Sequence, residues 1–438
     1  MKRRAFLKAS VVTVATATIA LKSENASAGL LATRKGFPVW QVFTNDTSAQ
    51  FKVMASSSFS VNYRALDSKG VEYPVELLSR TPNPYDAAQN FDHLIVNGIK
   101  VGVTYTLEVR DSTSKLVIDS REFAALETGS KNLSFALLSC MQDSFPQSGM
   151  WQSVSEARPD LMFFIGDTCY ANWSSDDTPA GHWKRNIETF TKLDVYYWKR
   201  LIPILATWDD HDYGKGDGDR FNNPIKEESL FAFKTFFGSA DRPGYKNGPG
   251  VSSMLNVRGH RFCLMDDRYF RDPAGTPEGL QWGLEQERWL LDEVRSSQDP
   301  VWLFNGSQFF GGYRGKESLE HQHPFQLKRV LEELSRVQAP VMFGSGDVHF
   351  SELMKLEPAL LGYETIEVTS SAMHSTTFPG NQNRGPSNPR RFAKATWHNN
   401  YVLIQSDASE PRTAQIRTRS IGKTLKKVYF DQTFTIKR

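Results

Sequence analysis

The sequence predicts an all-β sandwich of the immunoglobulin or fibronectin type followed by an α/β domain. A chain of 438 residues is longer than one ordinary hydrophobic core supports, which favours two domains. Between Trp40 and Leu126, short segments rich in Val, Thr, Tyr and Phe alternate with turn residues. From Leu133 onward, apolar strands alternate with segments of helical periodicity, the pattern of an α/β domain.

Residues 1–28 have the pattern of a signal peptide that is removed on export. A basic start, KRRAFLK, precedes an apolar run over residues 9–21, and Ala26-Ser27-Ala28 supplies a small-residue cleavage site. This run is shorter than the roughly 20 apolar residues that span a bilayer. The Arg3-Arg4 pair resembles a twin-arginine signal, which implies export of the folded protein by the Tat translocase. The alternative is an ordinary secretory signal. Both predict a periplasmic or secreted, extracellular protein.

Charge and composition exclude several classes of protein. The first 28 residues carry five basic residues and one acidic residue, so the remaining 410 residues have a net charge of −1 within a formal total of +3. A mature chain that is not basic does not favour a nucleic-acid-binding module. With 39% hydrophobic and 23% charged residues, the chain is not intrinsically disordered. Beyond the leader, no stretch is long and apolar enough to predict a transmembrane segment.

We expect the sandwich to occupy residues 36–127. Its seven predicted strands are QVFT, AQFKVMAS, SVNYRAL, PVELLS, FDHLIVNG, TYTLEVRD and LVIDSREFAA. Asn, Asp, Ser and Gly separate them at roughly the spacing of about 8–12 residues that is typical of sandwiches. Residues 128–132, TGSKN, form the predicted linker to the next domain.

We expect the α/β domain to occupy residues 133–438. Its predicted strands include SFALLSC, DLMFFIGD, IPILATWDD, RFCLMDDR, VWLFNGSQ, VMFGSGDVH and YETIEVTSS. Apolar residues recur three and four positions apart over 183–200, 227–238, 281–296 and 325–338, which predicts helices. After residue 398 the pattern returns to strands, in NYVLIQSD, TAQIRTRS and KKVYFDQTFTI.

Polar side chains follow five of these strands at the point where each strand ends. Ligands of open α/β sheets bind at this edge. The residues are Cys140; Asp167 and Tyr170 in GDTCY; Asp209, Asp210, His211 and Asp212 in WDDHDYG; Asn305 and Gln308 in FNGSQ; and Asp347 and His349 in GSGDVHFSE. Phosphate-ester hydrolysis uses metals that neutralise the phosphoryl oxygens and acidify water, and a proton donor for the leaving oxygen. A carboxylate such as that of Asp167 can bridge two metals.

The order of these motifs, Cys…GDxxY…WDDHD…GxQ…GDVHFSE, resembles the alkaline phosphatase D (PhoD-like) family of metallophosphoesterases. Relative to the usual metallophosphoesterase pattern, Cys140 stands in the first block and Tyr170 replaces the last Asp of the second. Asp210 replaces the Asn of the third block, and Gly346-Asp347-Val348-His349 replaces GHxH. The resemblance covers nearly all of the mature chain. It implies a four-layer αββα catalytic domain after the N-terminal sandwich, and a phosphoesterase activity.

The resemblance also implies a mixed metal pair, Fe³⁺ with Ca²⁺, and ligand chemistry agrees. Calcium prefers carboxylate, carbonyl and water oxygens, whereas a thiolate and a phenolate suit a trivalent or softer metal. We therefore place Cys140, Asp167, Tyr170 and His349 around iron, and Asp167, Asp210 and Asp347 toward the second metal. The Tyr170–iron bond predicts a visible charge-transfer band. Another divalent pair, such as Mn²⁺ or Zn²⁺, is the alternative.

The proton donor and the substrate contacts are assigned to three side chains beside the ligands. By resemblance to the wider superfamily His211, next to Asp210, protonates the leaving group, and its ordinary pKa near 6.5 suits that work. Asp209 or Asp212 would orient it. Arg268 is the predicted phosphate clamp, since arginine binds phosphate in a bidentate way. Arg271 is the second candidate for this role. For each arginine, a structural salt bridge is equally favoured.

Several other polar residues have a weaker functional case. The loop carrying Asp217 and Asp219 favours a flexible rim over a cation site, and His374 has either a rim or a ligand role. Cys169, beside two proposed ligands in GDTCY, is expected in the core or supporting the ligands, and Cys263, in the middle of the strand RFCLMD, is expected in the core. Three cysteines cannot form a complete disulfide framework.

The sequence therefore predicts an exported phosphoesterase that acts on a phosphate monoester or diester. The motifs describe the metal site and leave the substrate open. A phospholipase D-like phosphodiesterase acting on phospholipids is one alternative. Others are a non-catalytic binding protein that uses the sandwich, and a different metal hydrolase or iron redox protein.

Overall fold

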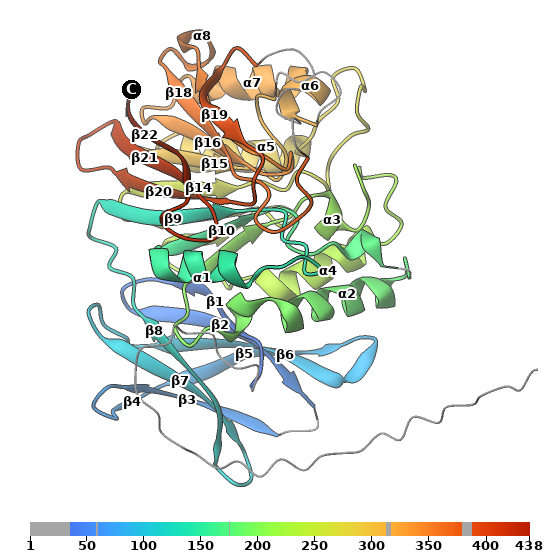
Figure 1. The fold of residues 1–438 in the computed structure, drawn as a ribbon, viewed down its shortest axis with the longest axis vertical. Helices are drawn as coiled ribbons and strands as arrows, with labels where there is room; N and C mark the ends of the chain where they lie inside the picture. Colours follow the sequence, from blue (N-terminus) through green and yellow to red (C-terminus); the bar gives the residue numbers. More distant parts are fainter. Residues whose placement is uncertain (1–35, 58–59, 175, 312–316, 379–387) are drawn as a thin grey trace, which may run out of the picture.

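The computed structural model describes residues 36–57, 60–174, 176–311, 317–378 and 388–438 (Figure 1). The predicted signal peptide and its twin-arginine motif lie outside the described residues. Among the helices that are described, none combines the length and the apolar character needed to cross a bilayer.

The N-terminal part of the chain forms two four-stranded antiparallel sheets. One sheet has the strand order β1-β2-β6-β5 and the other the order β4-β3-β7-β8. The strands are β1 (Val39–Thr44), β2 (Ser48–Ser56), β3 (Val61–Asp67), β4 (Glu72–Tyr73), β5 (Val75–Asn83), β6 (Asp86–Asn97), β7 (Thr104–Asp111) and β8 (Val117–Ala124). The two-residue strand β4 is additional to the seven predicted strands, and the others correspond to them.

The two N-terminal sheets share one apolar cluster. Phe51 and Leu94 from the first sheet meet Leu107 and Phe123 from the second, and the rings of Phe51 and Phe123 lie 4.7 Å apart edge to face. Alternating burial along β7 places its Tyr105, Leu107 and Val109 in this cluster. The sheets therefore pack face to face, because each buries the apolar side of its alternating pattern.

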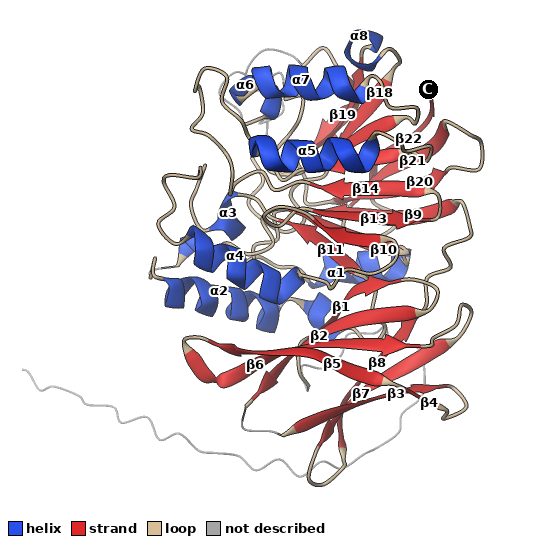
Figure 2. Ribbon diagram, turned by 180° about the vertical axis from the view of Figure 1, so that it is seen from behind, coloured by secondary structure: helices blue, strands red, loops and turns tan. Residues whose placement is uncertain are grey.

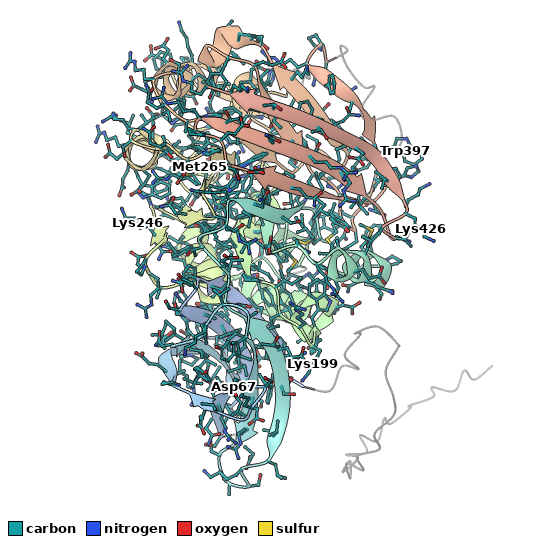
Figure 3. The ribbon with its side chains drawn as sticks, turned by 90° about the vertical axis from the view of Figure 1, so that its left-hand side faces the viewer. Asp67, Lys199, Lys246, Met265, Trp397 and Lys426 are labelled. Atoms are coloured by element: carbon teal, nitrogen blue, oxygen red, sulfur yellow. The ribbon has the colours of Figure 1, made fainter. Side chains whose placement is uncertain are left out.

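The β1-β2-β6-β5 sheet is buried on its other face as well. Trp40, Met54 and Phe91 from this face belong to a second core together with residues of the following domain. The Trp40 indole donates to the Phe236 carbonyl at 2.8 Å. On the β8 side, the Lys199 amine donates to the Ser120 carbonyl at 3.1 Å, and Lys199 is labelled beside the N-terminal strands in Figure 3. The two parts of the chain therefore share a packed interface.

Two larger sheets form the second domain. One has six strands in the order β11-β10-β9-β20-β21-β22, and the other has eight in the order β12-β13-β14-β15-β16-β18-β17-β19. The strands are β9 (Asn132–Leu138), β10 (Leu161–Ile165), β11 (Ile204–Thr207), β12 (Tyr245–Asn247), β13 (Ser253–Val257), β14 (His260–Leu264), β15 (Val301–Phe304), β16 (Val341–Ser345), β17 (Ser351–Leu356), β18 (Thr365–Thr369), β19 (Arg391–Thr396), β20 (Tyr401–Asp407), β21 (Thr413–Ile421) and β22 (Val428–Lys437).

The helices pack on the outer faces of these two sheets, as Figure 2 shows. They are α1 (Ser148–Ala157), α2 (Pro179–Lys192), α3 (Asp210–Tyr213), α4 (Lys226–Phe237), α5 (Gly283–Val294), α6 (Leu319–Gln322), α7 (Pro324–Leu334) and α8 (Pro358–Leu361), with 3₁₀ turns at Ala171–Trp173 and Asp194–Tyr197. Helices α1, α2 and α4 share a core with β9 and β10, and α5 and α7 share one with β15 and β16.

Between the two sheets lies a buried core rich in aromatic residues. Phe135 and Phe163 of the six-stranded sheet meet Phe262 and Trp302 of the eight-stranded sheet. The rings of Phe135 and Phe262 lie 5.1 Å apart edge to face. The continuous apolar runs of these strands follow from burial on both faces, against helices on one side and the opposite sheet on the other.

The structure differs from the sequence-based expectation in some elements. The helix predicted over 183–200 is wrong in extent, because α2 begins after the Thr178 cap and ends where Leu193 takes an extended conformation. The apolar residues beyond it are buried in a 3₁₀ turn instead, which imitates helical periodicity in the sequence. Four short strands, β12, β13, β17 and β19, and helix α1 were not predicted.

The carboxyl ends of parallel strands from the two sheets come into contact beside Gly346. Strands β9, β10 and β11 run parallel, and so do β14, β15, β16 and β18. Just after β16, a side chain at Gly346 would come within 2.6 Å of both the Ser139 hydroxyl and the Ile165 carbonyl. This contact requires glycine, and it brings the residues after β9, β10 and β16 together.

Candidate metal centre

Three predicted ligands occupy equivalent positions in the fold. Cys140, Asp167 and Asp347 each lie two residues beyond the end of a parallel strand, β9, β10 and β16 respectively. All three have a positive φ, of 55°, 55° and 65°, and His349 has a φ of 58°. Residues other than glycine rarely adopt this conformation, and strained backbone of this kind gathers at functional sites.

The structure brings four predicted ligands and the predicted proton donor His211 together in two overlapping groups. The ligand atoms of Cys140, Asp167 and His349 lie within 4.8 Å of one another, and so do those of Asp167, Asp210 and His211. The Cys140 sulfur lies 3.5 Å from Oδ2 of Asp167. Because Asp167 belongs to both groups, its carboxylate is placed to bridge two ions.

Burial and repulsion between negative charges raise the pKa values of acidic groups in this centre. Burial raises the pKa of the Cys140 thiol to about 12. Burial, followed by the charges of Cys140 and Asp210, raises the pKa of Asp167 well above its ordinary value. Desolvation, together with Glu317 and Asp210, raises the pKa of Asp347 to about 7. Bound cations would relieve this repulsion, so the residues present fit a metal pair.

Asp347 and Tyr170 take different positions beside the two groups. The backbone carbonyl of Asp347 lies 3.5 Å from the Cys140 sulfur, and its carboxyl faces the charges of Asp210 and Glu317. The Tyr170 hydroxyl donates to Ser375 Oγ at 3.0 Å, and its ring stacks on that of His211 at 4.1 Å. Their roles as ligands stay predictions.

His211 is held by Asn172, and neither of the two aspartates considered from the sequence contacts its ring. Nδ1 of His211 lies 2.7 Å from Oδ1 of Asn172. Asp209 instead binds Arg268, and Asp212 accepts the backbone N–H of Cys169 at 2.7 Å. Asn172 stands two residues after Tyr170 in GDTCYAN, and that proximity was the signal available in the sequence.

Arg268 lies in a buried ion-pair cluster behind the centre. Its guanidinium donates to Asp209 Oδ1 at 2.7 Å from Nε and to Glu317 Oε1 at 2.8 Å from Nη1. Arg271 also pairs with Glu317. Burial alone would raise the pKa of Glu317, but Arg268 and Arg271 outweigh it and lower the pKa. This geometry favours the structural salt bridge at Arg268 and Arg271, and the phosphate-clamp role stays a prediction.

Glu317 had no signal in the sequence, because it lies outside every motif. Its side chain reaches the cluster from the segment that precedes α6. The exposed Asp217 also contacts the centre through its backbone, whose N–H donates to Asp210 Oδ2 at 2.8 Å. Asp219 caps the turn that follows, accepting the N–H of Phe221 at 2.8 Å.

The remaining candidates lie beneath or behind the centre. The Asn305 amide donates to Asp267 at 3.0 Å, and the Gln308 amide donates to Glu352 at 2.9 Å. His374 is buried against Trp151, and burial lowers its pKa to about 4. The three thiols, those of Cys140, Cys169 and Cys263, are all buried and free.

The fold of this chain is shared with a solved protein. A structure of PhoD aligns with 94% of this chain and 90% of that chain at a TM-score of 0.70 and 16% sequence identity. The PhoD-like fold predicted from the motif order is therefore confirmed. At this identity the similarity concerns the fold, and activity has to be argued from the site.

The other comparisons are weaker. No family model matches the sequence, and no curated protein matches it. A conserved uncharacterised protein from Streptococcus pneumoniae, described as a predicted phosphoesterase, aligns with 69% of this chain and 98% of that chain. Its TM-score is 0.26 at 8% identity, too low to indicate a common overall fold.

Proposed function

We propose that this chain is a metal-dependent phosphoester hydrolase. The observation that carries the proposal is the position of Asp167 in both groups of candidate ligand atoms, with Cys140 and His349 on one side and, on the other, Asp210 beside the proposed proton donor His211. A bridging carboxylate between two sets of ligands is the arrangement that two-metal phosphoesterases need. The PhoD-like fold supports the same class of reaction.

The donor set assigns different chemistry to the two sides of Asp167. Cys140 and His349, joined by Tyr170, would hold Fe³⁺, because thiolate, imidazole and phenolate suit a softer or trivalent metal. Asp210 and Asp347 would face Ca²⁺, and Mn²⁺ or Zn²⁺ pairs are the alternative. When bound, such a pair acidifies the attacking water and neutralises the phosphoryl oxygens.

The chain supplies the proton for the leaving group. Oδ1 of Asn172 accepts from Nδ1 of His211, so Nε2 is the nitrogen that exchanges a proton with substrate. Tyr170 stacks on the same ring and fixes its plane. In-line attack of water on phosphorus would then be completed when His211 protonates the departing alkoxide.

The assignment of domains and the export of the protein are also part of this proposal. We assign residues 36–127 to an immunoglobulin- or fibronectin-like sandwich and residues 133–438 to an αββα metallophosphoesterase domain. We also propose Tat-dependent export to the periplasm or the cell exterior, followed by action on phosphate esters there. The KRRAFLK start and the Ala26-Ser27-Ala28 sequence support export.

The test combines elemental analysis with hydrolysis. The mature protein, purified without chelator, is expected to contain about one iron per chain together with calcium, and to show a visible band that is lost in Tyr170→Phe. It should hydrolyse bis(p-nitrophenyl) phosphate, and Asp167→Asn should lose both metal and activity. Asp177→Asn, which changes an exposed carboxylate on the neighbouring turn, is the matched control. Active protein without stoichiometric metal would overturn the proposal.

A further inference from the structure

Two exposed aromatic side chains flank the candidate centre. Trp173 is 54% exposed and Phe378 is 42% exposed. The Trp173 ring lies 5.5 Å from the ring of His211, edge to face, and the Phe378 ring lies 5.5 Å from the ring of His349. His211 and His349 belong to different ligand groups that share Asp167. The two aromatic side chains therefore lie beside different ends of the centre.

Each aromatic side chain is carried by the segment that also holds its histidine. Nδ1 of His211 bonds to Asn172, the residue before Trp173. Nδ1 of His349 bonds to the carbonyl of Thr376, two residues before Phe378. These hydrogen bonds thus link each imidazole to the short segment that carries the neighbouring aromatic residue. Exposed aromatic surface that is anchored at a polar site is typical of ligand subsites.

Beyond the metal pair that the proposed function requires, the two buried arginines add no unbalanced positive charge for a substrate, which favours a singly charged ester. Arg268 and Arg271 both pair with Glu317, and Arg268 also pairs with Asp209. These guanidinium groups are therefore already balanced by carboxylates. A phosphomonoester is a dianion near neutral pH and requires more positive charge than a phosphodiester, which is a monoanion.

We propose that the substrate is a phosphodiester whose two alcohol groups each carry a flat or apolar face, with one packed on Trp173 and the other on Phe378. Trp173 takes the leaving alcohol, because it adjoins His211, and Phe378 takes the alcohol that stays on phosphorus. This inference rests on the proposed hydrolase function and adds to it the class of ester.

The reaction balances without a further reagent. The oxygen of water forms the new bond to phosphorus, and the P–O bond beside Trp173 breaks. Its electron pair leaves with the alcohol oxygen, which takes the proton of His211. One proton from the attacking water passes to solvent and another returns to His211, so the products are a phosphomonoester and one alcohol.

Three substrates that release the same leaving group test the proposal. They are p-nitrophenyl phosphate, methyl p-nitrophenyl phosphate and phenyl p-nitrophenyl phosphate. Phe378→Ala should lower kcat/KM about tenfold for the phenyl diester, the factor that corresponds to about 1.4 kcal/mol of lost contact. It should leave the methyl diester unchanged. Trp173→Ala should lower kcat/KM for both diesters through KM, and Trp173→Phe should restore it.

Phe221→Ala is the matched control, since Phe221 is 70% exposed and packs under Arg220 instead of a histidine of the centre. Calorimetric binding of diphenyl phosphate to the metal-loaded protein gives a second readout. Both Trp173→Ala and Phe378→Ala should weaken the binding of diphenyl phosphate, whether or not the protein hydrolyses this ester. Equal losses on the methyl and phenyl diesters in Phe378→Ala, or unchanged diphenyl phosphate binding in both variants, would overturn the inference. Absence of hydrolysis of all three esters would overturn the proposed function instead.

Discussion

Oδ1 of Asn172 lies 2.7 Å from Nδ1 of His211, on the face of the centre that also carries Tyr170 and Asp167. An amide oxygen can only accept, so Nδ1 carries a hydrogen and Nε2 is directed to the reaction. The ring of Tyr170, 4.1 Å away and nearly parallel, limits tilting of the imidazole. One neutral hydrogen bond and one aromatic contact thus define the orientation of the proposed proton donor.

Loss of the Asn172 amide should impair proton donation selectively. In Asn172→Ala we expect kcat to fall by about tenfold to 100-fold for an alkyl ester, less than the roughly 100- to 10,000-fold that general acid catalysis supplies, because His211 itself is kept. An ester of p-nitrophenol needs little protonation of its leaving oxygen, so its kcat should fall much less. The measurement is kcat for both esters at saturating substrate. Equal losses would mean that Asn172 supports the fold and not the proton transfer.

Asn172→Asp keeps the acceptor and adds a negative charge. Burial lowers the pKa of His211 in the native protein. A carboxylate beside Nδ1 favours the imidazolium and should raise that pKa, so the falling limb of the kcat profile moves to higher pH. A profile that stays in place in the aspartate variant would contradict the assignment of His211 as the acid.

Because Arg268 pairs with buried carboxylates, we expect its substitution to lower the stability of the protein and not simply to weaken substrate binding. In Arg268→Gln, the buried carboxylates of Asp209 and Glu317 lose their shared cation, which should cost about 3–5 kcal/mol of unfolding free energy. Chemical denaturation of the metal-free variant measures this. Arg220→Gln removes a more exposed ion pair, to Asp272, and should cost about 1 kcal/mol or less. A stable Arg268→Gln protein with raised KM would instead support the phosphate clamp.

The positions of the proposed metal ligands could be predicted from the sequence, because the direction of each strand determines the edge of the sheet at which it ends. Cys140, Asp167 and Asp347 follow apolar strands, and parallel strands bring their carboxyl ends to one edge. The close contact of Gly346 with Ser139 and Ile165 was not predicted and comes from the structure.

The partners of these residues could not be predicted in the same way. The sequence suggested Asp209 or Asp212 as the partner of His211, whereas the turn after Tyr170 places Asn172 there instead. Glu317 meets Arg268 across 49 positions of sequence, a contact that no local pattern encodes. The end of α2 was mispredicted because buried residues continue beyond Leu193 without a helical backbone.

A buried histidine far from the centre should make stability depend on pH. His260 bonds Ser406 and the Arg258 carbonyl at 2.8 Å each, and burial lowers its pKa to about 4. Below about pH 6.5 His260 binds a proton in the unfolded chain, whereas in the folded chain it stays neutral until the pH approaches about 4. This contribution to stability is present above pH 6.5 and is lost toward pH 4, by up to about 1.4 kcal/mol per pH unit.

This effect is isolated by the stability gap, which is the difference in unfolding free energy between wild type and His260→Asn. The variant should be less stable at pH 7, and the gap should narrow as the pH falls from about 6.5 toward 4. His321→Gln, which alters an exposed histidine, is the matched control. Urea unfolding of the metal-free proteins at several pH values measures the gap. A gap that is independent of pH in His260→Asn would contradict the prediction.

Metal binding should release the proton of Cys140. Burial raises the pKa of this thiol to about 12, and the pKa of Asp347 is about 7. A thiolate ligand has to lose its proton first, so affinity should rise by at least about tenfold per pH unit above pH 7, and more steeply below it, where Asp347 is also protonated. Zn²⁺ serves as a redox-inert probe, and calorimetry in two buffers of different ionisation enthalpy counts the released protons. In Cys140→Ala one fewer proton should be released at pH 8, whereas Cys263→Ala, in a strand core, should release as many as the wild type. An unchanged proton count in Cys140→Ala would show that the thiol is not a ligand.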